Sequence, residues 1–180
     1  AMPNMLVLRP GDGNETSGAY KIAIQNRNRP SALCLSRQGM PNQENTSIDK
    51  VALGGYIVSD CEGTPDVIFI GTGSELNLCI EASKVITSLG KKTRVVSMPC
   101  VELFEEQSQS YKEEVLPSNI RKRIVVEAAE SFGWHKYIGL DGDSITMSSF
   151  GASAPGGLCM EKFGFTVEKV LEKSRNLLNK

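Results

Sequence analysis

The run DVIFIG (66–71) constrains the fold more than any other stretch, because four large apolar residues stand in it side by side. A strand with one face in water alternates apolar and polar residues, whereas a parallel strand covered by helices on both faces is apolar throughout. The run leads into a glycine-rich turn and then into a helical pattern over residues 74–89, which Gly90 is suited to end. Strand, turn and helix in this order favour an α/β fold.

The chain from residue 51 onward repeats this alternation. The predicted strands cover 55–60, 66–71, 93–99, 120–128 and 144–150. The predicted helices cover 74–89, 102–115 and 165–180, with a short helix or loop at 131–139. We expect a three-layer α/β sandwich with a mixed, mostly parallel five-stranded sheet. Only five residues separate the first two strands, too few for a parallel crossover, so this pair is expected to be antiparallel.

The first forty residues predict a smaller unit. Apolar runs at 5–10 and 31–36 flank a stretch in which Asp12 and Glu15 are placed to start a helix. Residues of these types three apart form a capping box, in which each side chain accepts a hydrogen bond from a free backbone N–H of the other's turn. Strand, helix and strand favour parallel strands joined by a right-handed crossover. Two strands and one helix bury little, so we interpret the unit as a β-α-β remnant of another α/β domain.

The segment GMPNQENTS (39–47) is polar and has no periodicity, which is typical of a linker. We therefore divide the chain into the small unit (1–40), a linker (41–50) and a larger domain (51–180).

Composition excludes some classes of function. Lysine and arginine number 20, aspartate and glutamate 21, and the net charge is −1, so we expect no basic face for nucleic acid. No apolar run approaches the ~20 residues that span a bilayer, so no membrane partner is expected. The start AMPNMLVLRPG lacks the charged end and long apolar core of a leader peptide. The five cysteines stand singly, which favours free thiols in a reducing compartment.

The turn Gly71–Ser74 has two interpretations. Its two glycines suit a phosphate loop, but leucine stands where a dinucleotide fingerprint needs a third glycine, and the lysine of a Walker loop is missing. We favour a plain helix start, with Thr72 or Ser74 as its cap and Glu75 in its positive first turn. A weak anion site made of backbone N–H groups is the alternative.

Other motifs resemble sites but have simpler interpretations. The Gly-Asp-Gly around Asp12 opens a thiamine diphosphate metal motif, but the asparagine pair that completes it does not follow, so we interpret Asp12 as a helix cap. DGD (141–143) lacks the spaced oxygen ligands of a calcium loop and is interpreted as a turn. His135 has no evident partner and is interpreted as structural. Glu127 and Glu130 could do acid–base work after a strand end, but carboxylates at a helix start are favoured.

Arg37 is harder to explain as a structural residue. It follows the apolar run 31–36 at its carboxyl end, where ligands bind in parallel α/β sheets. A guanidinium presents a rigid fork of donors that matches a phosphate group. From position alone, a ligand phosphate and a salt bridge within the protein both stay open.

Several stretches of the chain resemble the transketolase family and occur in that family's order. They are LRPGDGNETSGAYKIAI, LCLSRQGMP, GGYIVSD, DVIFIGTGSEL, RVVSMPCVELFEEQ, VVEAAESFGW and FGASAPGGLCMEKFGFTVEKV. They cover nearly the whole chain, and SRQ…P and FGASAP are the most specific of them.

The resemblance implies that residues 1–40 are the tail of a pyrimidine-binding domain and that residues 51–180 are the C-terminal domain. The full-length enzyme would be a homodimer that uses thiamine diphosphate and a divalent metal ion, Mg or Ca, to transfer a two-carbon ketol unit between sugar phosphates. The family's metal-binding loop, activating glutamate and active-site histidines match no residue here. We therefore expect no catalytic, cofactor-binding or metal-binding residue in this chain, and no activity from it alone. The arginine of the SRQ motif, which contacts the sugar phosphate in the family, matches Arg37.

Two alternatives stay open. A dihydroxyacetone synthase would have a similar C-terminal domain, although its frequent peroxisomal tripeptide is absent from the ending NLLNK. A stand-alone module for dimerisation or regulation would bind an anion at Gly71–Ser74. Cytosol and plastid are both compatible with the sequence.

Overall fold

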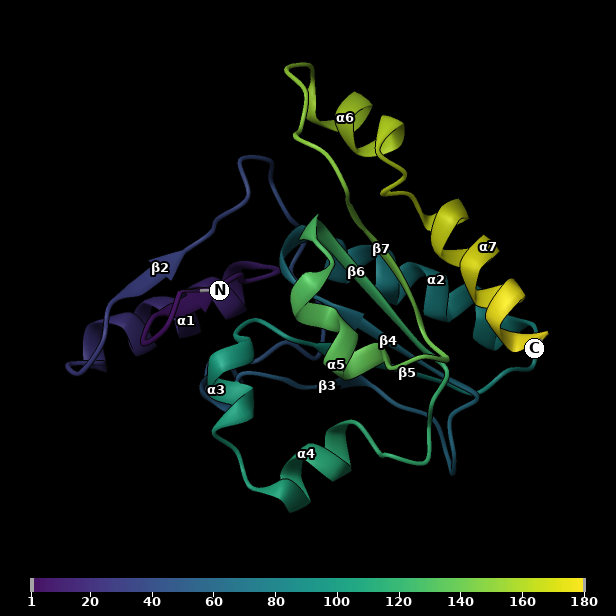
Figure 1. Ribbon diagram of the computed structural model, residues 1–180, viewed down its shortest axis with the longest axis horizontal. Helices are drawn as coiled ribbons and strands as arrows, with labels where there is room; N and C mark the ends of the chain where they lie inside the picture. The colour runs from purple at the N-terminus through teal and green to yellow at the C-terminus, as the bar shows by residue number, and fades with distance from the viewer. Residues whose placement is uncertain (1, 180) are drawn as a thin grey trace.

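Two sheets of different size organise the computed structural model, which describes residues 2–179 (Figure 1). The strands are β1 (Leu6–Leu8), β2 (Ser31–Leu33), β3 (Tyr56–Ser59), β4 (Val67–Gly71), β5 (Thr93–Ser97), β6 (Arg123–Glu130) and β7 (Asp143–Met147). The α-helices are α1 (Gly13–Gln25), α2 (Leu76–Ser88), α3 (Val101–Glu105), α4 (Gln109–Val115), α5 (His135–Ile138), α6 (Gly156–Lys162) and α7 (Val167–Leu178). The short 3₁₀ turns are η1 (Lys50–Leu53), η2 (Gly73–Glu75) and η3 (Phe132–Trp134).

The larger sheet has the strand order β3-β5-β4-β6-β7. The last four strands in this order are parallel, and β3 is antiparallel to its neighbour β5. The predicted mixed, mostly parallel five-stranded sheet is therefore confirmed. The predicted pairing of β3 with β4 is wrong, although the two strands do run in opposite directions, because β5 lies between them. Their short connection, residues 60–66, crosses the end of β5, a distance of about 10 Å that a connection of this length covers easily.

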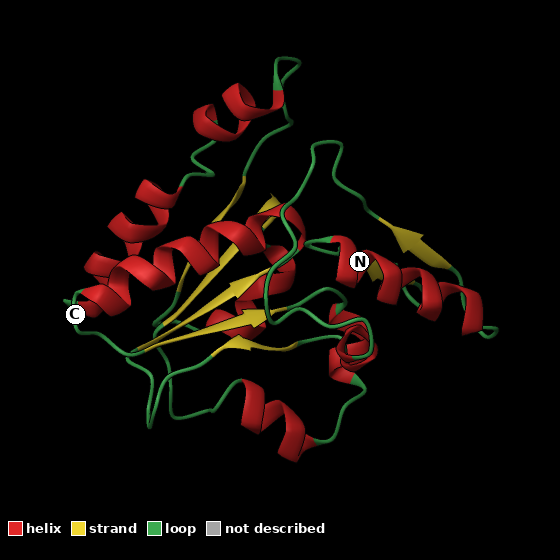
Figure 2. Ribbon diagram, turned by 180° about the vertical axis from the view of Figure 1, so that it is seen from behind, coloured by secondary structure: helices red, strands yellow, loops and turns green. Residues whose placement is uncertain are grey.

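Helices cover both faces of the larger sheet (Figures 1 and 2). On one face α2 and α7 enclose a core with Phe69, and on the other face α3, α4 and α5 enclose a core with Ile68 and Ile70. β4 lies at the centre and all five of its residues are buried. Its continuous apolar sequence follows from this position, and the three-layer α/β sandwich is confirmed.

The smaller sheet consists of β1 and β2, which pair in parallel as predicted and are joined by α1. Its core residues Leu6 and Leu8 pack with Ala19 of α1 and also with Val51 and Cys100 of the larger domain. The small unit therefore shares its apolar core with the larger domain instead of standing apart from it.

The capping box at the start of α1 forms with one of its two bonds shifted. The Asp12 carboxylate accepts a hydrogen bond from the backbone N–H of Glu15 at 2.9 Å, as predicted. The return bond is shifted by one residue, because the Glu15 carboxylate accepts the backbone N–H of Gly11 at 2.7 Å, and it also accepts hydrogen bonds from the hydroxyls of Tyr56 and Ser97 in the larger sheet. Glu15 thus joins the two sheets.

Several elements differ from the prediction, among them β7, which ends at Met147 and not at residue 150. β2 ends at Leu33, and β6 continues to Glu130, so Glu127 and Glu130 lie within the strand. The predicted helix 102–115 is two helices, because the Ser108 hydroxyl accepts a hydrogen bond from the N–H of Tyr111 and starts α4 there. α6 was not predicted, since it begins with two glycines and none of its residues is buried, which leaves no helical pattern of apolar residues.

Candidate functional site

Arg37 lies on an exposed loop beyond the carboxyl end of β2 (Figure 1). The N–H of Cys34 still donates to the carbonyl of Leu8 at 2.8 Å, so the chain leaves the small sheet only after that residue. Within residues 2–179 we find no hydrogen bond or ion pair of the Arg37 side chain. The structure therefore gives no salt-bridge partner in the described part of the chain, and the guanidinium is accessible to a ligand.

Asp12 is 4% exposed and its carboxylate is occupied within the protein. Oδ1 accepts the N–H of Glu15 at 2.9 Å, and Oδ2 accepts the N–H of Gln43 at 2.9 Å and the hydroxyl of Thr46 at 2.5 Å. A carboxylate engaged by three internal donors has little capacity left for a metal ion. Asp12 is therefore a helix cap that also contacts the segment returning from Arg37.

The glycine turn after β4 is bonded to the end of β1. The N–H of Gly73 donates to the carbonyl of Arg9 at 2.9 Å, and the hydroxyl of Thr72 donates to the same oxygen at 3.4 Å. The predicted caps are wrong, because Thr72 makes no capping bond and the Ser74 hydroxyl donates to the Glu75 carboxylate. A turn whose central N–H is engaged and whose glutamate is buried is a poor site for an anion.

A cluster of charged residues joins the small unit to the carboxyl end of the larger sheet. Nη2 of Arg9 lies 3.2 Å from Oε2 of Glu75, which is 1% exposed. Nε of Arg9 lies 3.1 Å from Oε1 of Glu127, although its N–H is not aimed for a hydrogen bond. The Trp134 indole N–H donates to Glu127, and the N–H of Ala128 donates to Glu75. Burial raises the pKa of Glu127.

This cluster was missed from the sequence. Arg9 follows an apolar run just as Arg37 does, so the same positional signal applied to both arginines. The partners of Arg9 lie far along the chain, 66 residues away in the case of Glu75. A cavity of about 520 Å³ opens beside Arg9, Glu127 and Trp134. Because the single positive charge of Arg9 is already engaged by two carboxylates, we interpret the cluster as a structural link rather than as a ligand site.

The remaining candidate residues lie apart from one another. Glu130 accepts a hydrogen bond from the backbone N–H two residues further on, where η3 begins. His135 is exposed, and its side chain forms no hydrogen bond or ion pair within the described residues. Asp141 and Asp143 each form an ion pair with a basic side chain, at 2.6 and 2.7 Å. These residues therefore do not form a shared reactive site.

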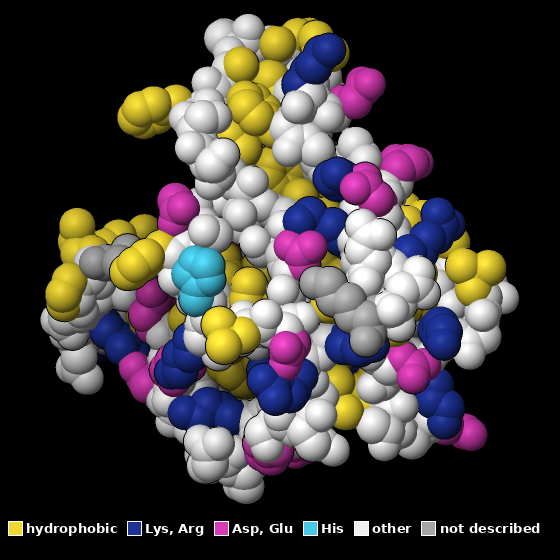
Figure 3. Space-filling view, turned by 45° about the vertical axis from the view of Figure 1, so that its right-hand side comes forward, with side chains coloured by type: hydrophobic (Ala, Val, Ile, Leu, Met, Phe, Trp, Pro, Cys, Tyr) yellow, Lys and Arg dark blue, Asp and Glu magenta, His cyan; other side chains and the backbone are white. Residues whose placement is uncertain are grey.

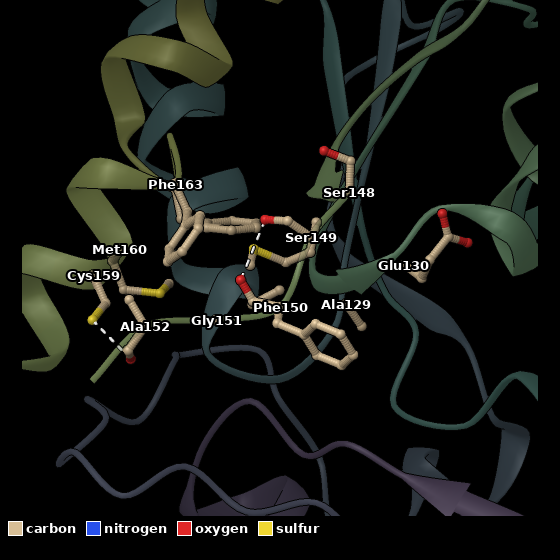
Figure 4. Close-up of a pocket in the computed structure, with 13 residues that line it drawn as sticks. Ala129, Glu130, Ser148, Ser149, Phe150, Gly151, Ala152, Cys159, Met160 and Phe163 are labelled. Carbon is tan, nitrogen blue, oxygen red and sulfur yellow. Dashed lines mark hydrogen bonds between the residues drawn. The ribbon is translucent and has the colours of Figure 1, made fainter. Parts of the chain in front are cut away.

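A second cavity, of about 830 Å³, lies between the end of β7 and α6 (Figure 4). Met160 and Phe163 line it on one side, and the segment with Ser149 and Phe150 lines it on the other. Apolar side chains gather in the same upper part of the molecule in Figure 3, and Phe150 is 99% exposed. An apolar lining of this kind suits contact with other apolar atoms rather than with a phosphate group.

Possible metal ligands and the two buried thiols are the remaining candidates for chemistry. Residues 2–179 contain no group of three or more His, Cys, Asp or Glu side chains placed to hold a metal ion. Burial raises the pKa of the Cys79 and Cys100 thiols, which disfavours the nucleophilic thiolate. None of the helices in this range combines the length and the apolar character that a membrane crossing requires.

Two family models match the chain. The transketolase-like C-terminal domain matches residues 54–166, which is more than half of the chain, and the transketolase pyrimidine binding domain matches residues 1–43. The chain belongs to the transketolase family.

Transketolases from distant organisms share its sequence and structure. A transketolase of Nostoc sp. is 59% identical over 180 residues, which make up 99% of this chain and 27% of the Nostoc protein. The chloroplastic transketolase-1 of Arabidopsis thaliana is 53% identical and is matched over 98% of this chain and 24% of its own length. A solved transketolase of Pichia stipitis in complex with sedoheptulose 7-phosphate superposes with a TM-score of 0.91 at 40% identity, over 99% of this chain and 26% of that one. The chain thus spans about a quarter of the length of these transketolases.

Proposed function

We propose that this chain is the C-terminal portion of a thiamine-diphosphate-dependent transketolase, which transfers a two-carbon ketol unit from a ketose phosphate to an aldose phosphate. The order of the two family matches and the likeness to solved transketolases over nearly the whole chain support this proposal. The full-length enzyme would act as a homodimer in the plastid or the cytosol. Chloroplastic relatives favour the plastid.

The proposed role of the chain in catalysis is to bind the sugar phosphate through Arg37. The observation that carries this role is an exposed guanidinium, with no partner among residues 2–179, at the carboxyl end of a parallel strand pair. A relative of similar structure has been solved with a sugar phosphate. Two parallel N–H donors of the arginine would hold the phosphate and so position the reacting carbon of the sugar.

The residues present do not fit the metal ion that such an enzyme would use. The Asp12 carboxylate is engaged by three internal donors, and the described residues offer no other ligand group. We therefore assign thiamine diphosphate and its Mg or Ca ion to parts of the enzyme outside this chain, and propose that the chain alone is inactive and serves structure and dimerisation. Turnover of a ketose phosphate by the purified 180-residue chain would contradict this assignment.

The role of Arg37 is tested in the full-length enzyme by Arg37→Ala, with fructose 6-phosphate and fructose compared as donors. Loss of a charge-assisted contact to phosphate is expected to lower kcat/KM for fructose 6-phosphate roughly 10- to 100-fold while leaving that for fructose within about twofold. Arg37→Lys is expected to fall between, because an ammonium keeps the charge but loses the planar fork.

Arg27→Ala is the matched control. Arg27 is also exposed, but it follows the end of α1, at the opposite end of the small sheet from Arg37. It is expected to leave both kcat/KM values unchanged. If Arg37→Ala lowers kcat/KM equally for both donors, Arg37 does not bind the phosphate. The same conclusion follows if Arg27→Ala lowers kcat/KM for fructose 6-phosphate as selectively as Arg37→Ala does.

A further inference from the structure

The loop that carries Arg37 is held at both ends and nowhere between. Cys34 bonds to β1 on one side, and Gln43 bonds to Asp12 on the other. Within residues 2–179 we find no hydrogen bond from residues 35–40. We call residues 35–42 the arginine loop. Arg37 stands near its middle, so its position depends on the two anchors.

The second anchor is a network centred on Asp12. Oδ1 of Asp12 bonds to Glu15 and starts α1, while Oδ2 accepts the N–H of Gln43 and the hydroxyl of Thr46. Around it, the N–H of Gly13 donates to Oδ1 of Asn42 at 2.9 Å. The two oxygens therefore have separate tasks, one in the helix cap and one in holding the returning arm of the arginine loop.

The residues of this network are buried and closely packed. Asp12 is 4% and Thr46 8% exposed, so their bonds are shielded from competing water. A Cβ atom on Gly13 would approach Oδ1 of Asn42 to 2.8 Å, so the loop arm passes directly against the start of α1. Release of this arm would lengthen the free loop and increase the number of positions open to Arg37.

We propose that Asp12 is a positioning residue for Arg37. By holding the returning arm through Oδ2, it restricts the arginine loop before substrate binds and lowers the entropy that is lost when the phosphate orders Arg37. This inference rests on the proposed role of Arg37 in sugar phosphate binding. Asp12 itself would not touch the substrate.

Asp12→Asn separates the two tasks of this side chain. Asparagine caps a helix about as well as aspartate, so the bond from Glu15 to Oδ1 can be kept. The amide NH₂ then replaces Oδ2 and faces the N–H of Gln43, donor against donor, so this hold on the arm is lost, while the bonds of Asn42 to Gly13 and of the Gln43 side chain to Asn77 remain. In the full-length enzyme we expect kcat/KM for fructose 6-phosphate to fall about three- to tenfold, with that for fructose within twofold. Thr46→Val, which removes another donor to Oδ2 and leaves the cap intact, is expected to act in the same direction.

A double variant decides whether Asp12 acts through Arg37. If it does, Asp12→Asn added to Arg37→Ala causes no further loss for fructose 6-phosphate, because there is no guanidinium left to position. If the fold-losses in kcat/KM of the two single variants multiply in the double variant, the inference is overturned. Thr166→Ala removes the cap of α7, remote from this loop, and controls for lost stability. Equal loss for both donors in Asp12→Asn, as a merely structural defect would give, would also overturn it.

Failure of this inference can be told apart from failure of the proposed function. If Arg37→Ala is selective for the phosphorylated donor and neither Asp12→Asn nor Thr46→Val is, only the positioning role is wrong. If Arg37→Ala is not selective, the phosphate role of Arg37 is wrong and the positioning role falls with it.

Discussion

At the scale of single residues, Glu15 is the side chain whose environment departs most from what its neighbours in sequence suggest. It is fully buried and accepts hydrogen bonds from Tyr56, from Ser97 and from the N–H of Gly11 at 2.7 Å. Burial raises its pKa above the ordinary value of 4.5 in spite of these donors. The capping-box pattern found its helix position and its bond to the backbone at the helix start, but not Tyr56 and Ser97, because Ser97 is 82 residues away.

The raised pKa of Glu15 gives a pH dependence whose sign can be worked out. The unfolded chain loses the proton near pH 4.5 and the folded chain only at higher pH, so the stabilisation is complete below pH 4.5 and is lost as pH rises through the raised pKa. Glu15→Gln removes this titration. We expect the free energy of unfolding of the wild type, minus that of Glu15→Gln, to fall between pH 4.5 and 7.5, by at most about 1.4 kcal/mol per pH unit. Urea denaturation over this range measures it, and a difference independent of pH would contradict it.

Arg9 and Arg37 show that a local sequence pattern cannot tell a partly buried ion-pair partner from an exposed arginine. Each follows an apolar run at the carboxyl end of a strand of the small sheet, and a sequence pattern treats them alike. Only the fold brings Glu75 and Glu127 to Arg9. The local pattern singled out Arg37 but left a ligand and a salt bridge both open, and the family resemblance favoured the ligand.

At the scale of elements, prediction succeeded where the apolar pattern was strong and failed where tertiary contacts set the ends. The sequence locates β4 and α2 from their apolar spacing, and it identifies Gly90 as the C′ residue, which comes directly after the C-cap Leu89 of α2. β6 runs past its predicted end because it pairs with β7 as far as Glu130. α6 has no buried residue, so nothing in its sequence could reveal a helix.

Gly90 allows a test of how α2 ends. Its φ of 80° lies in the left-handed region, and a Cβ atom there would meet no atom within 4 Å. Any cost of Gly90→Ala is therefore conformational, and we expect the free energy of unfolding to fall by about 1–2 kcal/mol. Gly133→Ala is the control, because its Cβ also meets nothing and its φ is not positive. It is expected to be neutral or to stabilise by up to about 1 kcal/mol. Equal effects of the two substitutions in chemical denaturation would contradict this account.

At the scale of the whole molecule, the fold class followed from the alternation of strands and helices, but the strand order did not. The position of β5 between β3 and β4 depends on pairing between distant segments, which no local pattern records. The same holds for the contact between the two sheets. Its less exposed charged part includes Arg9 with Glu75 and Glu127, and its more exposed part includes an ion pair between Arg29 and Glu106.

These two contacts predict unequal contributions to stability. Arg9→Met leaves Glu75 and Glu127 without their counter-charge in a buried setting, and we expect the free energy of unfolding to fall by about 3–5 kcal/mol. Arg29→Met removes a partly exposed pair across the same boundary and is expected to cost about 0–1 kcal/mol. Guanidinium denaturation of the two variants measures both values. Similar losses would mean that the Arg9 cluster is not the main link between the small unit and the larger domain.

The reversed direction of β3 has a practical consequence. Because β3 begins beside Glu15 and runs away from the small unit, the turn that follows it lies at the opposite end of the sheet from Arg37. Residues 62–64 of this turn are exposed. An affinity tag or a fluorophore inserted there would sit well away from Arg37, so that immobilised or labelled protein can be prepared without crowding that residue.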